Sequence, residues 1–96
     1  MFVDKVSNPE DDEGALRKAE GIILNKLASH YNDGTTLTSY QELKDSVGAI
    51  TSENFDTALE ELIAQSLILS PDGENYEITG YGIDEYKRRK TEGTLF

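Results

Sequence analysis

Apolar positions recur along the chain with periods that distinguish helices from strands. Between residues 15 and 31 they follow one another at steps of three and four: Leu16, Ala19, Ile23, Leu27 and Tyr31. This spacing places them on one face of an amphipathic helix. The turn-forming residues Asn32-Asp33-Gly34 follow directly and favour a helix end. We therefore predict a first helix over residues 15–31.

The middle of the chain contains two further helix starts. Ser39 is followed three residues later by Glu42, a capping-box pattern that predicts a short helix ending at Gly48. Thr51 is predicted to cap a third helix, with Ile50 and Phe55 at the spacing of a hydrophobic staple. This third helix is expected over residues 52–66, and it should bury one stripe of side chains: Phe55, Ala58, Leu59, Leu62 and Ile63.

The β-structure predicted from the sequence is small. β-Branched residues at 35–38 are sufficient only for a stub of strand. Two further strands, at 67–70 and 75–79, flank the sequence Pro71-Asp72-Gly73, in which proline pre-sets a turn and glycine accepts a positive φ. We predict an antiparallel hairpin that turns at Asp72-Gly73. Thr79 then caps a last helix, with Ile83 and Tyr86 on one face.

Charge is distributed unevenly over these elements. The chain of 96 residues has a net charge of −10, and residues 45–86 contain ten acidic residues but neither lysine nor arginine. One basic cluster, residues 87–90, follows this stretch. Because ordinary protein surfaces intersperse both signs, the third helix and the hairpin are predicted to form an unusually acidic surface.

Composition narrows the classes of function. The absence of cysteine excludes disulfides and thiolate metal sites, and the single histidine, His30, has no second histidine for a paired site. No apolar run reaches membrane-spanning length and no signal-peptide pattern is present, so we expect a cytoplasmic protein without membrane contact. No nucleophile or dinucleotide motif occurs. We expect no cofactor, no metal and no enzymatic activity.

The predicted order, helix, stub strand, helix, helix, hairpin and helix, resembles a winged helix-turn-helix domain over residues 15–90. The resemblance rests on the tight turn at Ile50-Thr51, the hairpin tip and the pattern Tyr76-x-Ile78-Thr79-x-x-Gly82. That pattern is similar to the strand-to-helix corner of small bacterial and archaeal regulators. It implies an α+β fold with a three-helix core, a hairpin wing and an added C-terminal helix. An acidic N-terminal arm (1–14) and a tail (91–96) would flank this domain.

In winged helices that bind DNA, the third helix enters the major groove and the wing contacts the backbone, so both need positive charge. Here these elements carry acidic residues instead: Glu53, Asp56, Glu60, Asp72 and Glu74. We therefore expect a regulatory or adaptor module whose acidic third helix and wing bind a protein partner with a basic surface, with only weak or indirect DNA binding. A specialised form would mimic DNA. The simpler interpretation of the acidic residues is a solvated surface, and halophilic adaptation would also explain them.

The alternative is a dimeric DNA-binding transcription regulator. It would contact DNA through the basic end of the last helix, Lys87, Arg88, Arg89 and Lys90, assisted by Arg17 and Lys18. The simpler interpretation is that the helix dipole favours cations at this end. A homodimer through the first and last helices, with Leu95 and Phe96 contributing, is also expected, because apolar residues remain at both chain ends.

Overall fold

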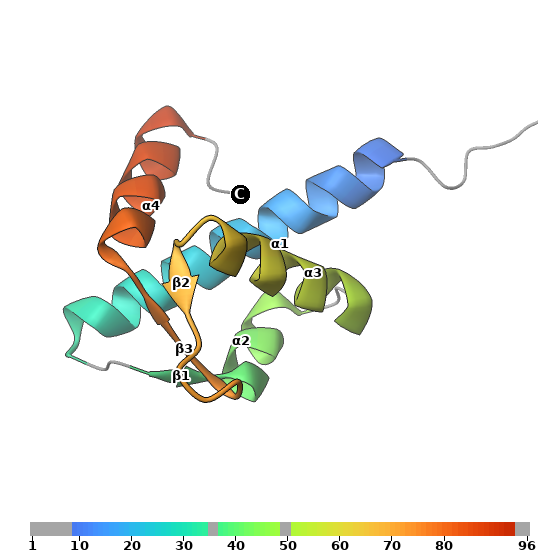
Figure 1. The fold of residues 1–96 in the computed structure, drawn as a ribbon. Coiled ribbons are helices and arrows are strands. Elements are labelled where there is room, and N and C mark those ends of the chain that lie inside the picture. The colour runs from blue at the N-terminus through green and yellow to red at the C-terminus, as the bar shows by residue number, and fades with distance from the viewer. Residues whose placement is uncertain (1–8, 35–36, 49–50, 94–96) are drawn as a thin grey trace, which may run out of the picture.

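The computed structural model describes residues 9–34, 37–48 and 51–93, which form four helices and a three-stranded antiparallel sheet (Figure 1). In chain order the elements are α1 (Pro9–Asn32), β1 (Thr38–Ser39), α2 (Tyr40–Val47), α3 (Ser52–Ala64), β2 (Ile68–Leu69), β3 (Asn75–Ile78) and α4 (Gly80–Glu92). The predicted α+β class and element order are confirmed. None of the described helices is both long and apolar enough to cross a membrane.

Helix α1 begins at Pro9, within the segment expected to be an acidic arm. Proline is favoured at the first helical position, which suits a helix start at Pro9. The predicted boundary at residue 15 is therefore too late. Residues 1–8 lie outside the described part of the chain.

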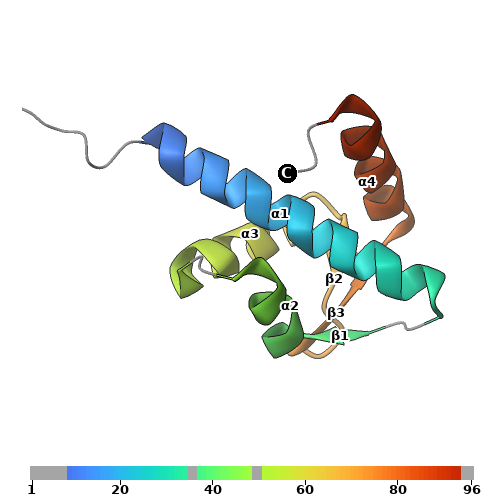
Figure 2. The same ribbon diagram turned by 180° about the vertical axis from the view of Figure 1, so that it is seen from behind.

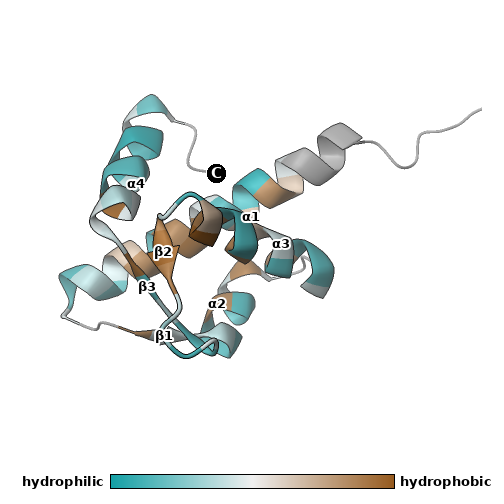
Figure 3. Ribbon diagram, viewed as in Figure 1, coloured by the Kyte–Doolittle hydropathy of each residue, from teal (hydrophilic) through white to brown (hydrophobic). Residues whose placement is uncertain are grey.

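The core lies where α1 crosses the other elements. Figure 2 shows α2 and α3 on one side of α1 and α4 on the other, and Figure 3 shows hydrophobic residues along the middle of α1 and on β2. The buried core includes Ala19, Ile23, Leu24, Leu27, Leu43, Phe55, Ala58, Leu59, Leu62, Ile68, Tyr76 and Ile78. The predicted stripes of α1 and α3 are thus confirmed at most positions.

Two residues of those stripes are exposed. Ile63 is 40% exposed, whereas Ala58 and Leu62 of the same helix are fully buried. Tyr31 is 59% exposed in the last turn of α1, at the edge of the core. Helical periodicity identifies the correct face but does not locate the end of the packed region.

All three predicted N-caps are present. The side-chain oxygens of Ser39, Thr51 and Thr79 accept hydrogen bonds from backbone N–H groups three residues later, at 3.1, 3.1 and 3.0 Å. The Glu42 carboxylate does not make the contact expected in a capping box. It lies 3.3 Å from His30 Nε2 and 3.5 Å from Lys26 Nζ of α1 instead. Ile50, the other half of the predicted staple, is outside the described residues.

Strand β3 is central in the sheet, which has the order β1-β3-β2. Thr38 of β1 is opposite Tyr76, and Ile68 of β2 is opposite Ile78. The hairpin turns where predicted, with Gly73 at a φ of +79°. This arrangement brings the hairpin tip beside the start of α2, where Tyr40 N–H donates to the Glu74 carbonyl at 2.9 Å.

Hydrogen bonds hold the end of α3, the start of β2 and the start of α4 close together. After the end of α3, Ser66 takes a left-handed backbone conformation with a φ of 63°, although it is not a glycine. The Leu67 N–H then donates to the Leu62 carbonyl at 3.0 Å, which closes the end of the helix. The Thr79 hydroxyl donates to the Ser66 carbonyl at 2.6 Å, and the Thr79 N–H donates to the Leu67 carbonyl at 3.0 Å. Thr79 therefore fixes the start of α4 against the end of α3 and the start of β2.

Candidate functional site

Three acidic residues predicted from the sequence lie together on the outer side of α3. Glu53, Asp56 and Glu60 are all exposed, whereas Phe55 and Leu62 of the same helix are buried. Residues three and four apart are neighbours on a helix surface, so the three carboxylates form one row. We call this row the acidic face.

The middle residue of the acidic face is held by α2. The Tyr40 hydroxyl donates to Asp56 Oδ1 at 2.7 Å, and the Tyr40 ring packs edge-on against Phe55 with centroids 5.0 Å apart. The hydrogen bond to Asp56 raises the pKa of Tyr40 to about 12, because the carboxylate favours the protonated phenol. Asp56 is therefore positioned by a neighbouring helix as well as by its own.

At the hairpin tip, the two predicted acids differ in their surroundings. Asp72 accepts from the backbone N–H groups of Glu74 and Asn75 at 2.9 and 2.8 Å, and from the Asn75 side-chain amide at 2.9 Å. These bonds, the Asn75 amide foremost, lower the pKa of Asp72. Its carboxylate therefore closes the turn, and its contact with a protein partner stays a prediction. Glu74 is exposed beside it.

Tyr76 connects the acidic face to the hairpin tip. Its ring is buried in β3, and burial raises the pKa of Tyr76, with further electrostatic contributions from Asp56 and Asp72. Tyr40 joins the same two elements by direct contacts, because its hydroxyl donates to Asp56 of α3 and its backbone N–H donates to the Glu74 carbonyl of the hairpin tip. Neither Tyr40 nor Tyr76 is recognisable from the sequence as a connecting residue, since only the pairing of β1 with β3 brings them to this place.

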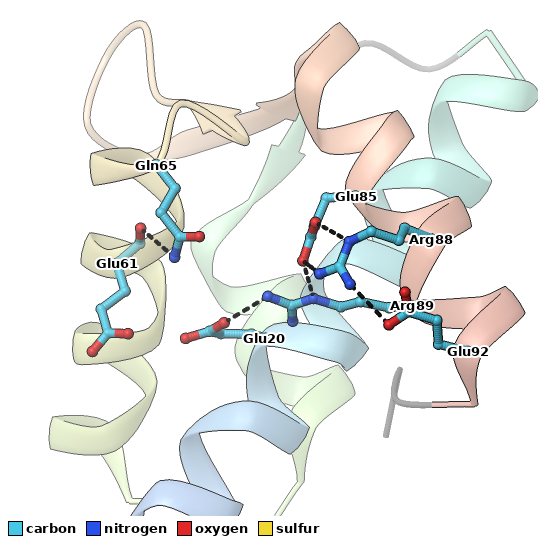
Figure 4. Close-up of polar contacts among 7 residues, drawn as sticks. All are labelled: Glu20, Glu61, Gln65, Glu85, Arg88, Arg89 and Glu92. Atoms are coloured by element: carbon cyan, nitrogen blue, oxygen red, sulfur yellow. Dashed lines mark hydrogen bonds and ion pairs between the residues drawn. The ribbon is translucent and has the colours of Figure 1, made fainter.

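The basic end of α4 is largely engaged within the chain (Figure 4). Arg88 contacts Glu85 at 2.7 Å and Glu92 at 2.8 Å, whereas Arg89 contacts Glu85 at 2.6 Å and Glu20 of α1 at 3.3 Å. Lys90 Nζ lies 5.8 Å from the centre of the Tyr86 ring. The predicted cluster is therefore not a row of four cations directed at solvent.

Arg89 in particular belongs to the contact between α4 and α1. Its side chain is only 12% exposed, and its carboxylate partner Glu20 is also buried. Burial raises the pKa of Glu20, the Arg89 guanidinium opposes that rise, and the nearby Glu61 carboxylate adds to it. The DNA contact predicted for Arg89 would have to be made by a side chain that here lies between α4 and α1.

His30 links the end of α1 to β1 and α2. Its Nδ1 lies 2.6 Å from the Thr38 hydroxyl, and its Nε2 faces the Glu42 carboxylate. Over residues 9–34, 37–48 and 51–93, no three His, Cys, Asp or Glu residues form a group that could hold a metal ion. The contacts of His30 are those of a residue that joins secondary-structure elements.

No family model, curated protein or solved structure matches this chain.

Proposed function

We propose that the chain is a non-enzymatic winged-helix module that binds a protein partner with a basic surface. The acidic face of α3 and the hairpin tip would form the binding surface, with the hairpin as the wing. The observation that carries the proposal is that Tyr40 contacts both elements, Asp56 of α3 through its hydroxyl and the Glu74 carbonyl of the hairpin tip through its N–H. Residues 45–86, which supply most of this surface, contain neither lysine nor arginine.

The site offers two kinds of contact to a lysine or arginine of a partner. Exposed carboxylates attract the cation over a distance and orient the approaching protein, which increases the rate of association more than the final affinity. The half-buried Tyr40 ring next to the Asp56 carboxylate can contact the same cation through its π face. Because exposed charges are screened by ions, binding should weaken as salt increases.

A DNA-binding role for α3 has less support, because phosphates would meet Glu53, Asp56 and Glu60. The basic residues at the end of α4 are also poorly suited to bind phosphate, since Arg88 and Arg89 contact carboxylates of the same chain. Neutralisation of phosphate by cationic side chains supplies most non-specific affinity for DNA. We therefore place DNA recognition second to protein binding.

A titration of the labelled full chain with a synthetic lysine- and arginine-rich peptide tests the proposal by NMR. The shifts should be concentrated on α3, the start of α2 and the hairpin tip. The variant Glu53→Gln/Glu60→Gln should weaken binding while leaving the Tyr40–Asp56 contact intact. The control Asp33→Asn/Asp45→Asn removes the same charge elsewhere and should bind like the original chain. Equal effects of the two double variants would show that only net charge matters.

A gel-shift assay with duplex DNA tests the alternative. The original chain should bind random duplex no more tightly than about 10⁻⁴–10⁻⁶ M at physiological salt. Glu53→Gln/Glu60→Gln should bind it more tightly, because two repulsive charges are removed. A sequence-specific complex at roughly 10⁻⁸ M that this variant loses would contradict the proposed function.

A further inference from the structure

An apolar groove lies on a different side of the molecule, between the start of α4, β2 and the last turn of α1. It is lined by three large apolar side chains that are mostly exposed: Tyr31 at 59%, Leu69 at 50% and Tyr81 at 72%. Single exposed apolar residues are ordinary, but a contiguous patch marks an interaction site. With the usual surface area of an aromatic side chain, these exposed fractions mean that the two tyrosines together expose roughly 250 Å².

Two charged residues of α4, Asp84 and Lys87, border this groove. They are three residues apart and so lie side by side on one helix face. Within the described part of the chain they form no ion pair or hydrogen bond, whereas Glu85, Arg88, Arg89 and Glu92 are paired with one another or with α1 (Figure 4). Helix α4 therefore has one internally paired face and one face with an acid and a base left over.

We propose that the face of α4 carrying Asp84 and Lys87 packs antiparallel against the same face of a second copy of the chain. In such a dimer the two copies are related by a two-fold axis, so residue i of one copy contacts residue j of the other and the reverse. Asp84 of each copy would therefore lie opposite Lys87 of the other. Gly80, which also lines the groove, permits close approach at the end of this face. Tyr31, Leu69 and Tyr81 lie beside the helix pair and lose their exposed surface.

The charges of Asp84 and Lys87 favour a second copy of the chain over a basic peptide as the molecule that binds this groove. A basic peptide calls for acids alone along the groove, whereas Asp84 and Lys87 offer one charge of each sign. The inference goes beyond the proposed function and uses none of the residues of the acidic face. Leu95 and Phe96, expected from the sequence to contribute to a homodimer, lie outside the described residues.

The size of the patch sets the strength of the dimer. A standard interface buries about 800 Å² on each partner, so the two tyrosines supply about a third and the polar face of α4 must supply much of the rest. A net charge of −10 on each copy opposes association. The dimer should therefore dissociate in the micromolar range.

Sedimentation of the full chain from roughly 1 to 100 μM tests the proposal, since mass action shifts a weak dimer across such a range. Asp84→Lys and Lys87→Asp should each raise the dissociation constant by about tenfold or more, because like charges then face each other. The double variant Asp84→Lys/Lys87→Asp should restore it. Asp45→Lys and Lys18→Asp make the same changes in net charge at exposed positions outside the groove and should leave dimerisation in place.

The apolar half of the interface is tested with Tyr81→Ser and Leu69→Ser. Both side chains are at least half exposed, so circular dichroism should show an unchanged fold while the dimer is lost. A chain that stays monomeric throughout the concentration range would overturn the proposal. So would a dimer that is unaffected by the single charge reversals, or one that the double reversal fails to restore.

Discussion

Replacement of Gly82 by alanine tests how closely α4 approaches the hairpin. Gly82 lies in the first turn of α4, where alanine would ordinarily stabilise a helix by up to about 1 kcal/mol. A Cβ atom at this position would lie only 2.5 Å from Ile78 Cγ1 and even closer to the Leu67 carbonyl oxygen, at 2.1 Å. The steric effect therefore opposes the gain in helix propensity.

The clash is with backbone, so no side-chain rotation can relieve it. Normal packing needs a separation of about 3.5 Å, so α4 and Leu67 must move apart by at least ~1 Å. The Leu67 carbonyl also accepts from Thr79 N–H at 3.0 Å and from the Thr79 hydroxyl at 3.1 Å. Overpacking costs about 1–3 kcal/mol and each weakened hydrogen bond about 1 kcal/mol. After the gain in helix propensity, Gly82→Ala should lose about 2–4 kcal/mol.

Urea unfolding followed by circular dichroism measures this loss. With a slope near ~1 kcal/mol/M for a small domain, the midpoint should fall by about 2 M or more. Gly80→Ala is the matched control, because it lies in the same helix and its Cβ would meet no atom within 4 Å. That variant should be as stable as the original chain or more stable by up to about 1 kcal/mol. Equal midpoints for the two variants would refute the close approach of α4 to Leu67.

Two further predictions concern the core and the acidic surface. Leu59→Ala should cost about 2–5 kcal/mol, because Leu59 is 3% exposed, whereas Ile63→Ala at a 40% exposed position should cost less than about 1 kcal/mol; similar urea midpoints would contradict this packing. Tyr40 should ionise near pH 12 rather than at its ordinary value of about 10, and Asp56→Asn should bring its tyrosinate absorbance back toward that value. The raised pKa means that the Tyr40–Asp56 contact adds stability below pH 10, which is lost as pH rises through 12; an identical titration of both chains would count against the contact.

Much of the fold follows from local signals in the chain. The caps at Ser39, Thr51 and Thr79 and the turn at Gly73 were predictable, because each depends on residues within a few positions of one another. The start of α1 was not, because the acidic residues 10–13 suit both a solvated arm and the first turn of a helix.

The candidate site was predictable only in part. The row of acids on α3 follows from helical spacing, but the role of Asp72 depends on hydrogen bonds within its turn. The burial of Arg89 depends on the contact between α4 and Glu20, which lies far away in the sequence. Tertiary contacts of this kind decide whether a charged residue is available to a partner, and no local pattern encodes them.

The central position of β3 has a consequence for the order of folding. Strand β1 contains two residues and pairs with β3, which lies more than thirty residues further along the chain. Helices α1 to α3 all precede β3 in the chain, so they can collapse first, whereas β1 has no strand to pair with until β3 has formed. Closure of a long loop slows such pairing. We therefore expect sheet formation to limit the folding rate, with substitutions in β3 slowing refolding and those in α4 mainly accelerating unfolding.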